Sequence, residues 1–128
     1  MKLEYLADGS PDCPLIRLYD FIPAEAGQLL TAMIALATGT AERVDVHELP
    51  FVEPVGECRL ALVRRSRDQA ITRGPGPREF QCGFTAGTWD NIAGLLEPFA
   101  EDAGGCQWLA GIPGETAFLL SASASGQW

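Results

Sequence analysis

The alternation of apolar and polar residues along the chain predicts a series of short strands. In the clearest case Cys58, Leu60 and Leu62 share one face, while Ala61 and Val63 lie on the other. Patterns of this kind cover residues 2–6, 14–21, 43–49, 58–65, 69–72, 78–84, 106–110 and 116–122. Turn residues separate the three strands between 58 and 84, which predicts an antiparallel meander, and the last two strands predict a hairpin.

Two segments instead repeat their apolar residues at helical spacing. The first begins at Pro23, because proline fits a first helical turn, and ends at Gly39, which adopts the left-handed conformation at little cost. The second follows Thr85, a good N-cap, and places Trp89 on an apolar stripe. Pro98 predicts that this helix ends near residue 97.

The order of these elements predicts one α+β domain over residues 1–128. We expect a mainly antiparallel sheet of about six to seven short strands, with two helices packed on one face. A split β-α-β plan is one form of this arrangement, because strand–helix–strand occurs twice. The length suits one domain with its own core, and no low-complexity linker divides it.

The composition of the chain indicates which kinds of partner it is expected to bind. The chain has nine basic and 17 acidic residues and a net charge of −8, which disfavours general binding to nucleic acid. No apolar run is long enough for a signal peptide or a membrane span, so we expect a soluble, cytoplasmic protein without a membrane partner. The four cysteines lie far apart in the sequence and are expected to be free, structural thiols.

The basic residues are concentrated in one segment of this acidic chain. Between residues 57 and 79 six arginines face three acids, a balance of +3, while the rest has three basic and 14 acidic residues, a balance of −11. Guanidinium groups bind carboxylates and phosphates in bidentate fashion, so Arg59, Arg64, Arg65 and Arg67 are candidate ligand- or partner-binding residues. The alternative is internal neutralisation by acids of the chain, for example of Arg59 by Glu79.

Motifs for catalysis are weak. His47 is the only histidine, and on a strand it shares a face with Asp45, so the two are weak candidates for metal ligands. No third ligand, nucleophile elbow or phosphate-binding glycine loop accompanies them. We therefore predict no catalytic residues and no cofactor. Trp108, on a predicted strand, is a further candidate for contact with a ligand or partner.

Three hypotheses about function remain. The favoured one is a non-catalytic protein-interaction module of the inhibitor, immunity or regulatory type, because an acidic surface steers basic partners. The second is a binding domain for a small anionic ligand, or a minor enzyme, that uses the arginine-rich strands and His47. The third is a structural homo-oligomer without a ligand, for example a homodimer.

Overall fold

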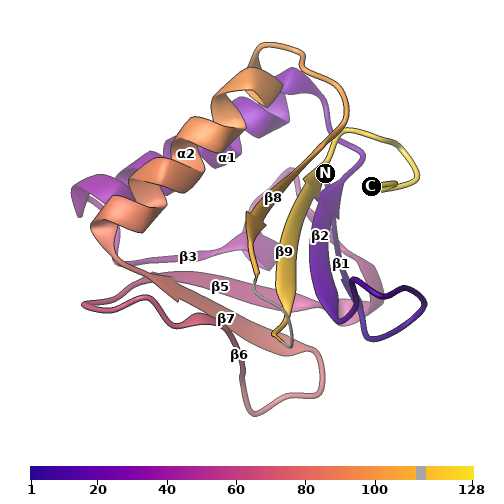
Figure 1. The fold of residues 1–128 in the computed structure, drawn as a ribbon. Helices are drawn as coiled ribbons and strands as arrows, with labels where there is room; N and C mark the ends of the chain where they lie inside the picture. The colour runs from indigo at the N-terminus through magenta and orange to yellow at the C-terminus, as the bar shows by residue number, and fades with distance from the viewer. Residues whose placement is uncertain (112–114) are drawn as a thin grey trace.

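A computed structural model describes residues 1–111 and 115–128 of the chain. Within these residues two helices and nine strands form a single α+β domain, as predicted, but the strands make two sheets instead of one. Figure 1 shows the two helices side by side above the sheets. The turn predicted between the last two strands lies largely outside the described residues.

Sheet A joins the two ends of the chain. Its five strands lie in the order β4-β1-β2-β9-β8, in which β1–β2 and β8–β9 pair antiparallel and β1–β4 and β2–β9 pair parallel. The strands are β1 (Lys2–Leu6), β2 (Leu15–Tyr19), β4 (Glu53–Pro54), β8 (Cys106–Ala110) and β9 (Ala117–Ser121). The predicted C-terminal hairpin is therefore confirmed, and the two-residue strand β4 is an addition that no alternation pattern indicated.

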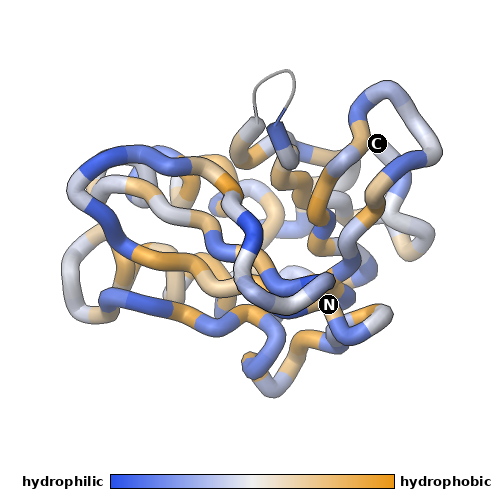
Figure 2. Tube along the Cα trace, turned by 90° about the horizontal axis from the view of Figure 1, so that it is seen from below, coloured by the Kyte–Doolittle hydropathy of each residue, from blue (hydrophilic) through white to orange (hydrophobic). Residues whose placement is uncertain are grey.

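Sheet B is built from the middle of the chain. Its four strands lie in the order β3-β5-β7-β6, and Figure 2 shows from below how hydrophobic stretches of the chain alternate with hydrophilic turns. The strands are β3 (Arg43–Asp45), β5 (Arg59–Arg64), β6 (Ala70–Arg73) and β7 (Glu79–Phe84).

The prediction of an antiparallel meander in sheet B was wrong. Strands β5 and β7 are parallel neighbours, and β6 lies on the outer side of β7. Burial explains this order, because β7 buries Phe80, Cys82 and Phe84 and suits the interior, whereas β6 leaves Thr72 and Arg73 exposed and suits an edge. Both sheets are thus mixed, and the expectation of a mainly antiparallel sheet holds only in part.

Each helix carries the chain from one sheet to the other. Helix α1 (Pro23–Thr38) connects β2 in sheet A to β3 in sheet B, and α2 (Ala86–Ala100) connects β7 in sheet B to β8 in sheet A. The split β-α-β plan is therefore wrong, because neither unit returns to its own sheet. Gly39 caps α1 and Thr85 caps α2 as predicted, but α2 continues past Pro98 to Ala100.

One hydrophobic core joins the helices to both sheets. Trp89 of α2 is fully buried, and its indole N–H donates to the carbonyl oxygen of Val63 on β5 at 3.0 Å. The polar atom of a buried indole needs such a partner. The bond also holds α2 against β5 of sheet B.

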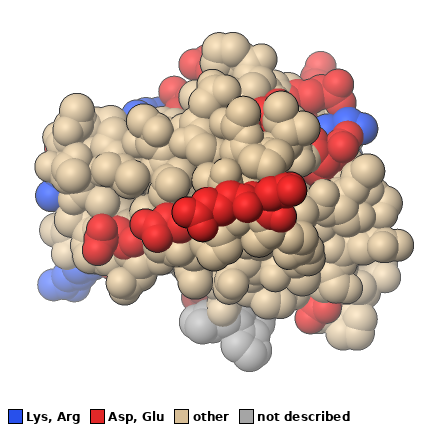
Figure 3. Space-filling view, turned by 90° about the horizontal axis from the view of Figure 1, so that it is seen from above, with Lys and Arg blue, Asp and Glu red and all other residues tan. Residues whose placement is uncertain are grey.

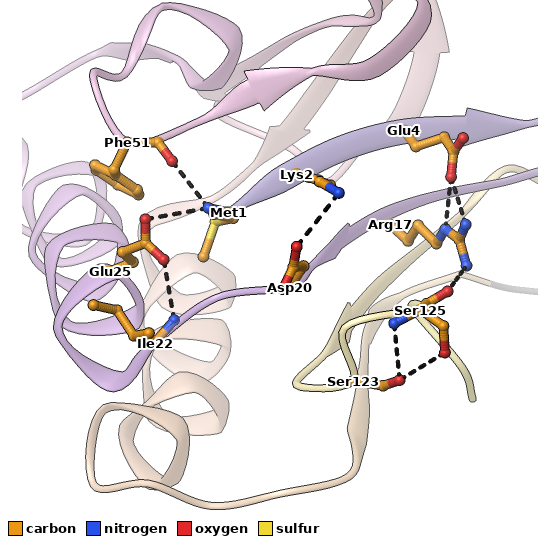
Figure 4. Close-up of polar contacts among 10 residues, drawn as sticks. All are labelled: Met1, Lys2, Glu4, Arg17, Asp20, Ile22, Glu25, Phe51, Ser123 and Ser125. Atoms are coloured by element: carbon orange, nitrogen blue, oxygen red, sulfur yellow. Dashed lines mark hydrogen bonds and ion pairs between the residues drawn. The ribbon is translucent and has the colours of Figure 1, made fainter.

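Polar contacts hold the ends of sheet A in place (Figure 4). The ammonium group of Met1 donates to Glu25 at 3.2 Å and to the carbonyl oxygen of Phe51 at 3.0 Å. The same carboxylate accepts from the backbone N–H of Ile22 at the start of α1. Glu25 thereby connects β1 to the first turn of the helix that follows β2.

Candidate functional site

The structure divides the predicted arginine group into two. Arg59 begins β5 and Arg64 ends it, and a six-residue strand separates its ends by roughly 17 Å at about 3.3 Å per residue. Arg65 and Arg67 follow Arg64 and lie beyond that second end. Arg59 therefore belongs to a different surface from the other three.

The arginines at the far end of β5 have local roles or project into solvent. The guanidinium group of Arg64 lies against Gly39 at the C-terminus of α1, where a cation complements the helix dipole. Arg65 donates to the side-chain oxygen of Gln81 at 3.0 Å, and Arg67 is exposed. None of these three side chains lines the cleft at the other end of β5.

Arg59, in contrast, lines a cleft of about 610 Å³. This cleft lies where the parallel strands β5 and β7 begin, and we call it the β5–β7 cleft. Its lining residues are His47, Pro54, Glu57, Cys58, Arg59, Gly76, Pro77, Arg78 and Glu79. The volume falls within the range of roughly 300–1,000 Å³ that is usual for small-ligand sites.

Parallel pairing is what brings Arg78 next to Arg59. The backbone N–H of Arg59 donates to the carbonyl oxygen of Arg78 at 2.8 Å, and Arg59 stands opposite Glu79 in the ladder. The guanidinium group of Arg78 also lies against Gly56, whose φ of 62° and close approach both require glycine. Two arginines that are distant in sequence therefore share one concave surface.

Neither of these arginines is paired with an acid in the described part of the chain. Among the residues that the structure describes, Arg59 and Arg78 form no ion pair and no side-chain hydrogen bond. The predicted ion pair of Arg59 with Glu79 is not formed. The two residues stand opposite each other in the ladder, but no ion pair joins their side chains. One oxygen of Glu79 instead accepts from the backbone N–H of Gly76 at 3.1 Å.

His47 lines the same cleft, although not in the way the sequence suggested. Strand β3 ends at Asp45, and residues Val46–Glu48 form a 3-10 turn, so His47 and Asp45 do not share a strand face. Nδ1 of His47 accepts from the backbone N–H of Leu60 at 3.0 Å. Nδ1 also lies 3.3 Å from the carbonyl oxygen of Leu60, so the backbone of Leu60 holds this side of the ring, while Nε2 has no hydrogen bond among the described residues.

The weak metal candidates gain no support from this arrangement. Asp45 is paired with Arg43 at 3.0 Å. In residues 1–111 and 115–128 no group of three or more histidine, cysteine or acidic side chains has the spacing of a metal site.

Cys58 contributes an apolar wall to the cleft. Its side chain is buried, and this burial raises the pKa of the thiol to about 11. The thiol is protonated at neutral pH, whereas a nucleophilic cysteine needs the thiolate. All four cysteines are free, and Cys58 and Cys82 are buried as the sequence predicted.

Trp108 lies apart from the arginines. It is on β8, the edge strand of sheet A, where 39% of its surface is exposed, and it lines no part of the β5–β7 cleft. The sequence predicted a turn at residues 74–77, but not that this turn, Glu57 and Arg78 line a cleft. The sequence does place Arg78 at the start of a strand, directly after that turn. It does not give the strand order that puts Arg78 beside Arg59.

A second charged surface lies along α2. Figure 3 shows a row of acidic side chains across the helical side of the molecule, with basic side chains only near its margins. Asp90 and Glu97 are exposed on α2, and Glu101 and Asp102 follow directly after it. Neither helix contains a lysine or arginine, so nothing within the helices interrupts this row.

A scan of protein-family models and searches of curated proteins and of solved structures found no match to the chain. Among the described residues, neither helix combines the length and the apolar composition needed to cross a membrane.

Proposed function

We propose that the protein is a non-catalytic binding domain that holds an anionic group of its ligand, a carboxylate or a phosphate, in the β5–β7 cleft. The observation that carries this proposal is that Arg59 and Arg78 line one cleft and have no acidic partner in the described part of the chain. Two guanidinium groups on a concave surface suit bidentate recognition of such an anion.

Two further features support binding over catalysis. The backbone of Leu60 holds Nδ1 of His47, and Nε2 has no hydrogen bond among the described residues, which leaves it open to a ligand. Cys58, the nucleophile nearest to it in the cleft, is a protonated thiol. The cleft therefore supplies donors for an anion but no activated nucleophile beside a free base.

Titration calorimetry with inorganic phosphate and with citrate tests this function. The double variant Arg59→Ala/Arg78→Ala should lose affinity by a factor of about 100 or more, since each charge-assisted hydrogen bond contributes about 1.5–3 kcal/mol. The matched control is Arg65→Ala/Arg67→Ala, which removes the same charge outside the cleft and should bind like the wild type. Equal losses in the two variants would overturn the proposal.

A second proposal follows from the acidic row on α2, which suits an interaction module that docks on a basic protein. Its support is the run of Asp90, Glu97 and Glu101 with no cation in either helix. Complementary charge accelerates the association of such partners and makes it sensitive to salt. The partner would be another protein, and a homodimer through this face is disfavoured because like charges would meet.

Affinity purification from the native host, followed by native mass spectrometry, tests this docking. We expect a captured protein with a basic surface to be lost at high salt and with Asp90→Asn/Glu97→Gln/Glu101→Gln. The control, Asp8→Asn/Glu42→Gln/Glu53→Gln, makes the same change in charge at exposed acids elsewhere. A protein retained by both variants would contradict docking on the helices.

A further inference from the structure

The β5–β7 cleft contains acids as well as arginines. Glu57 and Glu79 line it together with Arg59 and Arg78, so the formal charges of these four side chains cancel. In the part of the chain that the structure describes, none of the four forms an ion pair with another. A ligand that is only anionic would meet two guanidinium groups but also two carboxylates, and the carboxylates would repel it.

The opposite charges are also close neighbours. Arg59 and Glu79 stand directly opposite each other on adjacent parallel strands, which lie about 4.8 Å apart in a sheet. Glu79 uses one oxygen to accept from the N–H of Gly76 and keeps the other for a further donor. A ligand with a cation and an anion a few ångströms apart would satisfy both side chains at once.

The remaining walls are apolar. Pro54 and Pro77 line the cleft, and Cys58 adds a protonated thiol that behaves as a small hydrophobic group. A ligand held at its charged end by the four side chains would therefore place a hydrocarbon group against these residues.

We infer that the ligand is a small zwitterion with its amine beside its carboxylate, the chemistry of a free α-amino acid with an apolar side chain. This inference rests on the proposed function, because the carboxylate binds at Arg59 and Arg78. It adds that the ammonium group donates to Glu57 and Glu79, and that Pro54 and Pro77 contact the side chain.

Calorimetry with three related probes measures how much each charge of the ligand contributes to binding. L-Leucine has both, N-acetyl-L-leucine lacks the cation, and L-leucinamide lacks the anion. We expect L-leucine to bind at least tenfold more tightly than either analogue, because charged hydrogen bonds contribute this much or more.

The variant Glu57→Gln/Glu79→Gln makes the test sharper. It should weaken the binding of L-leucine at least tenfold. It should strengthen the binding of N-acetyl-L-leucine, because it removes the repulsion of the ligand's carboxylate. The amide that replaces the carboxylate of Glu79 keeps an oxygen for the N–H of Gly76, so the turn is preserved. The control variant Glu42→Gln/Glu97→Gln, with the same change in charge at exposed sites outside the cleft, should bind all three probes like the wild type.

The outcomes distinguish this inference from the proposed function. If N-acetyl-L-leucine and citrate bind as tightly as L-leucine and all three depend on Arg59 and Arg78, the zwitterion is wrong and the anion site stands. If neither L-leucine nor any anion binds, both fall. Binding of L-leucine that is unaffected by the Glu57→Gln/Glu79→Gln variant would also overturn the inference.

Discussion

Arg17, in the middle of β2, and Arg59, at the start of β5, both lie on inner strands of their sheets but have very different surroundings. Arg17 donates through Nε to Glu4 at 3.0 Å and through Nη1 to the carbonyl oxygen of Gly126 at 2.8 Å, and it stacks over the ring of Tyr19. Figure 4 shows how Arg17 connects Glu4 on β1 to the C-terminal tail near Ser125. Arg59 has no such partner among the described residues, although it stands opposite an acid.

This difference separates a structural arginine from one that is available for binding. The side chain of Arg17 is only 14% exposed, and its donors are used within the fold. Arg59 and Arg78 keep their donors for whatever enters the cleft. The sequence already indicated Arg59 as a candidate for binding, because it belongs to a basic segment, but it did not indicate that Arg17 is held within the fold.

The largest expected effect is on stability. Arg17→Ala should lower the free energy of unfolding by about 2–3 kcal/mol, because it removes charge-assisted hydrogen bonds and leaves Glu4 without its partner. Arg59→Ala should change the same quantity by no more than about 0.5 kcal/mol, as expected for an exposed side chain without partners. Urea unfolding of both variants measures the difference.

Glu4→Gln provides the control for this comparison, since it keeps the shape of the acceptor and removes its charge. The free energy of unfolding of Glu4→Gln should lie between those of the wild type and of Arg17→Ala. Equal losses for Arg17→Ala and Arg59→Ala would show that Arg59 has a structural partner after all, and the distinction between the two sheets would fail.

A smaller effect concerns the acid inside the basic segment. Asp68 does not neutralise Arg65 or Arg67, because its carboxylate accepts from the backbone N–H of Thr85 at 2.9 Å and from the hydroxyl of Thr88 at 2.8 Å. These hydrogen bonds, the backbone one foremost, lower the pKa of Asp68. The acid therefore stabilises the start of α2 and leaves the arginines unpaired.

The pH dependence follows from the direction of this shift. Because the pKa of Asp68 is lower in the folded than in the unfolded state, its contribution is present above about pH 4 and is lost as the pH falls through the folded value. Asp68→Asn should cost about 0.5–1 kcal/mol at pH 7, since the side chain is exposed and solvent screens it. Unfolding of both proteins between pH 7 and pH 2 should show the difference shrink towards zero, whereas a constant difference would exclude a role of the charge.

Much of the local structure was predictable. Pro23 and Gly39 bound α1, Thr85 caps α2, and the alternation around Cys58, Leu60 and Leu62 marks β5, because these signals act between residues a few positions apart. One error was also local in origin. The strand over residues 43–49 stops at Asp45, where buried Val46 begins a 3-10 turn, and this turn carries His47 into the lining of the cleft.

By itself, the sequence determined the fold class, the two helices and the location of most strands, because hydrophobic periodicity and caps are properties of neighbouring residues. Only the tertiary structure decided that β5 lies beside β7, that the strands form two sheets, and that Arg78 faces the same cleft as Arg59. A strand with two apolar faces fits several neighbours equally well. The choice among them depends on how the helices and both sheets share one core, which no short stretch of sequence encodes.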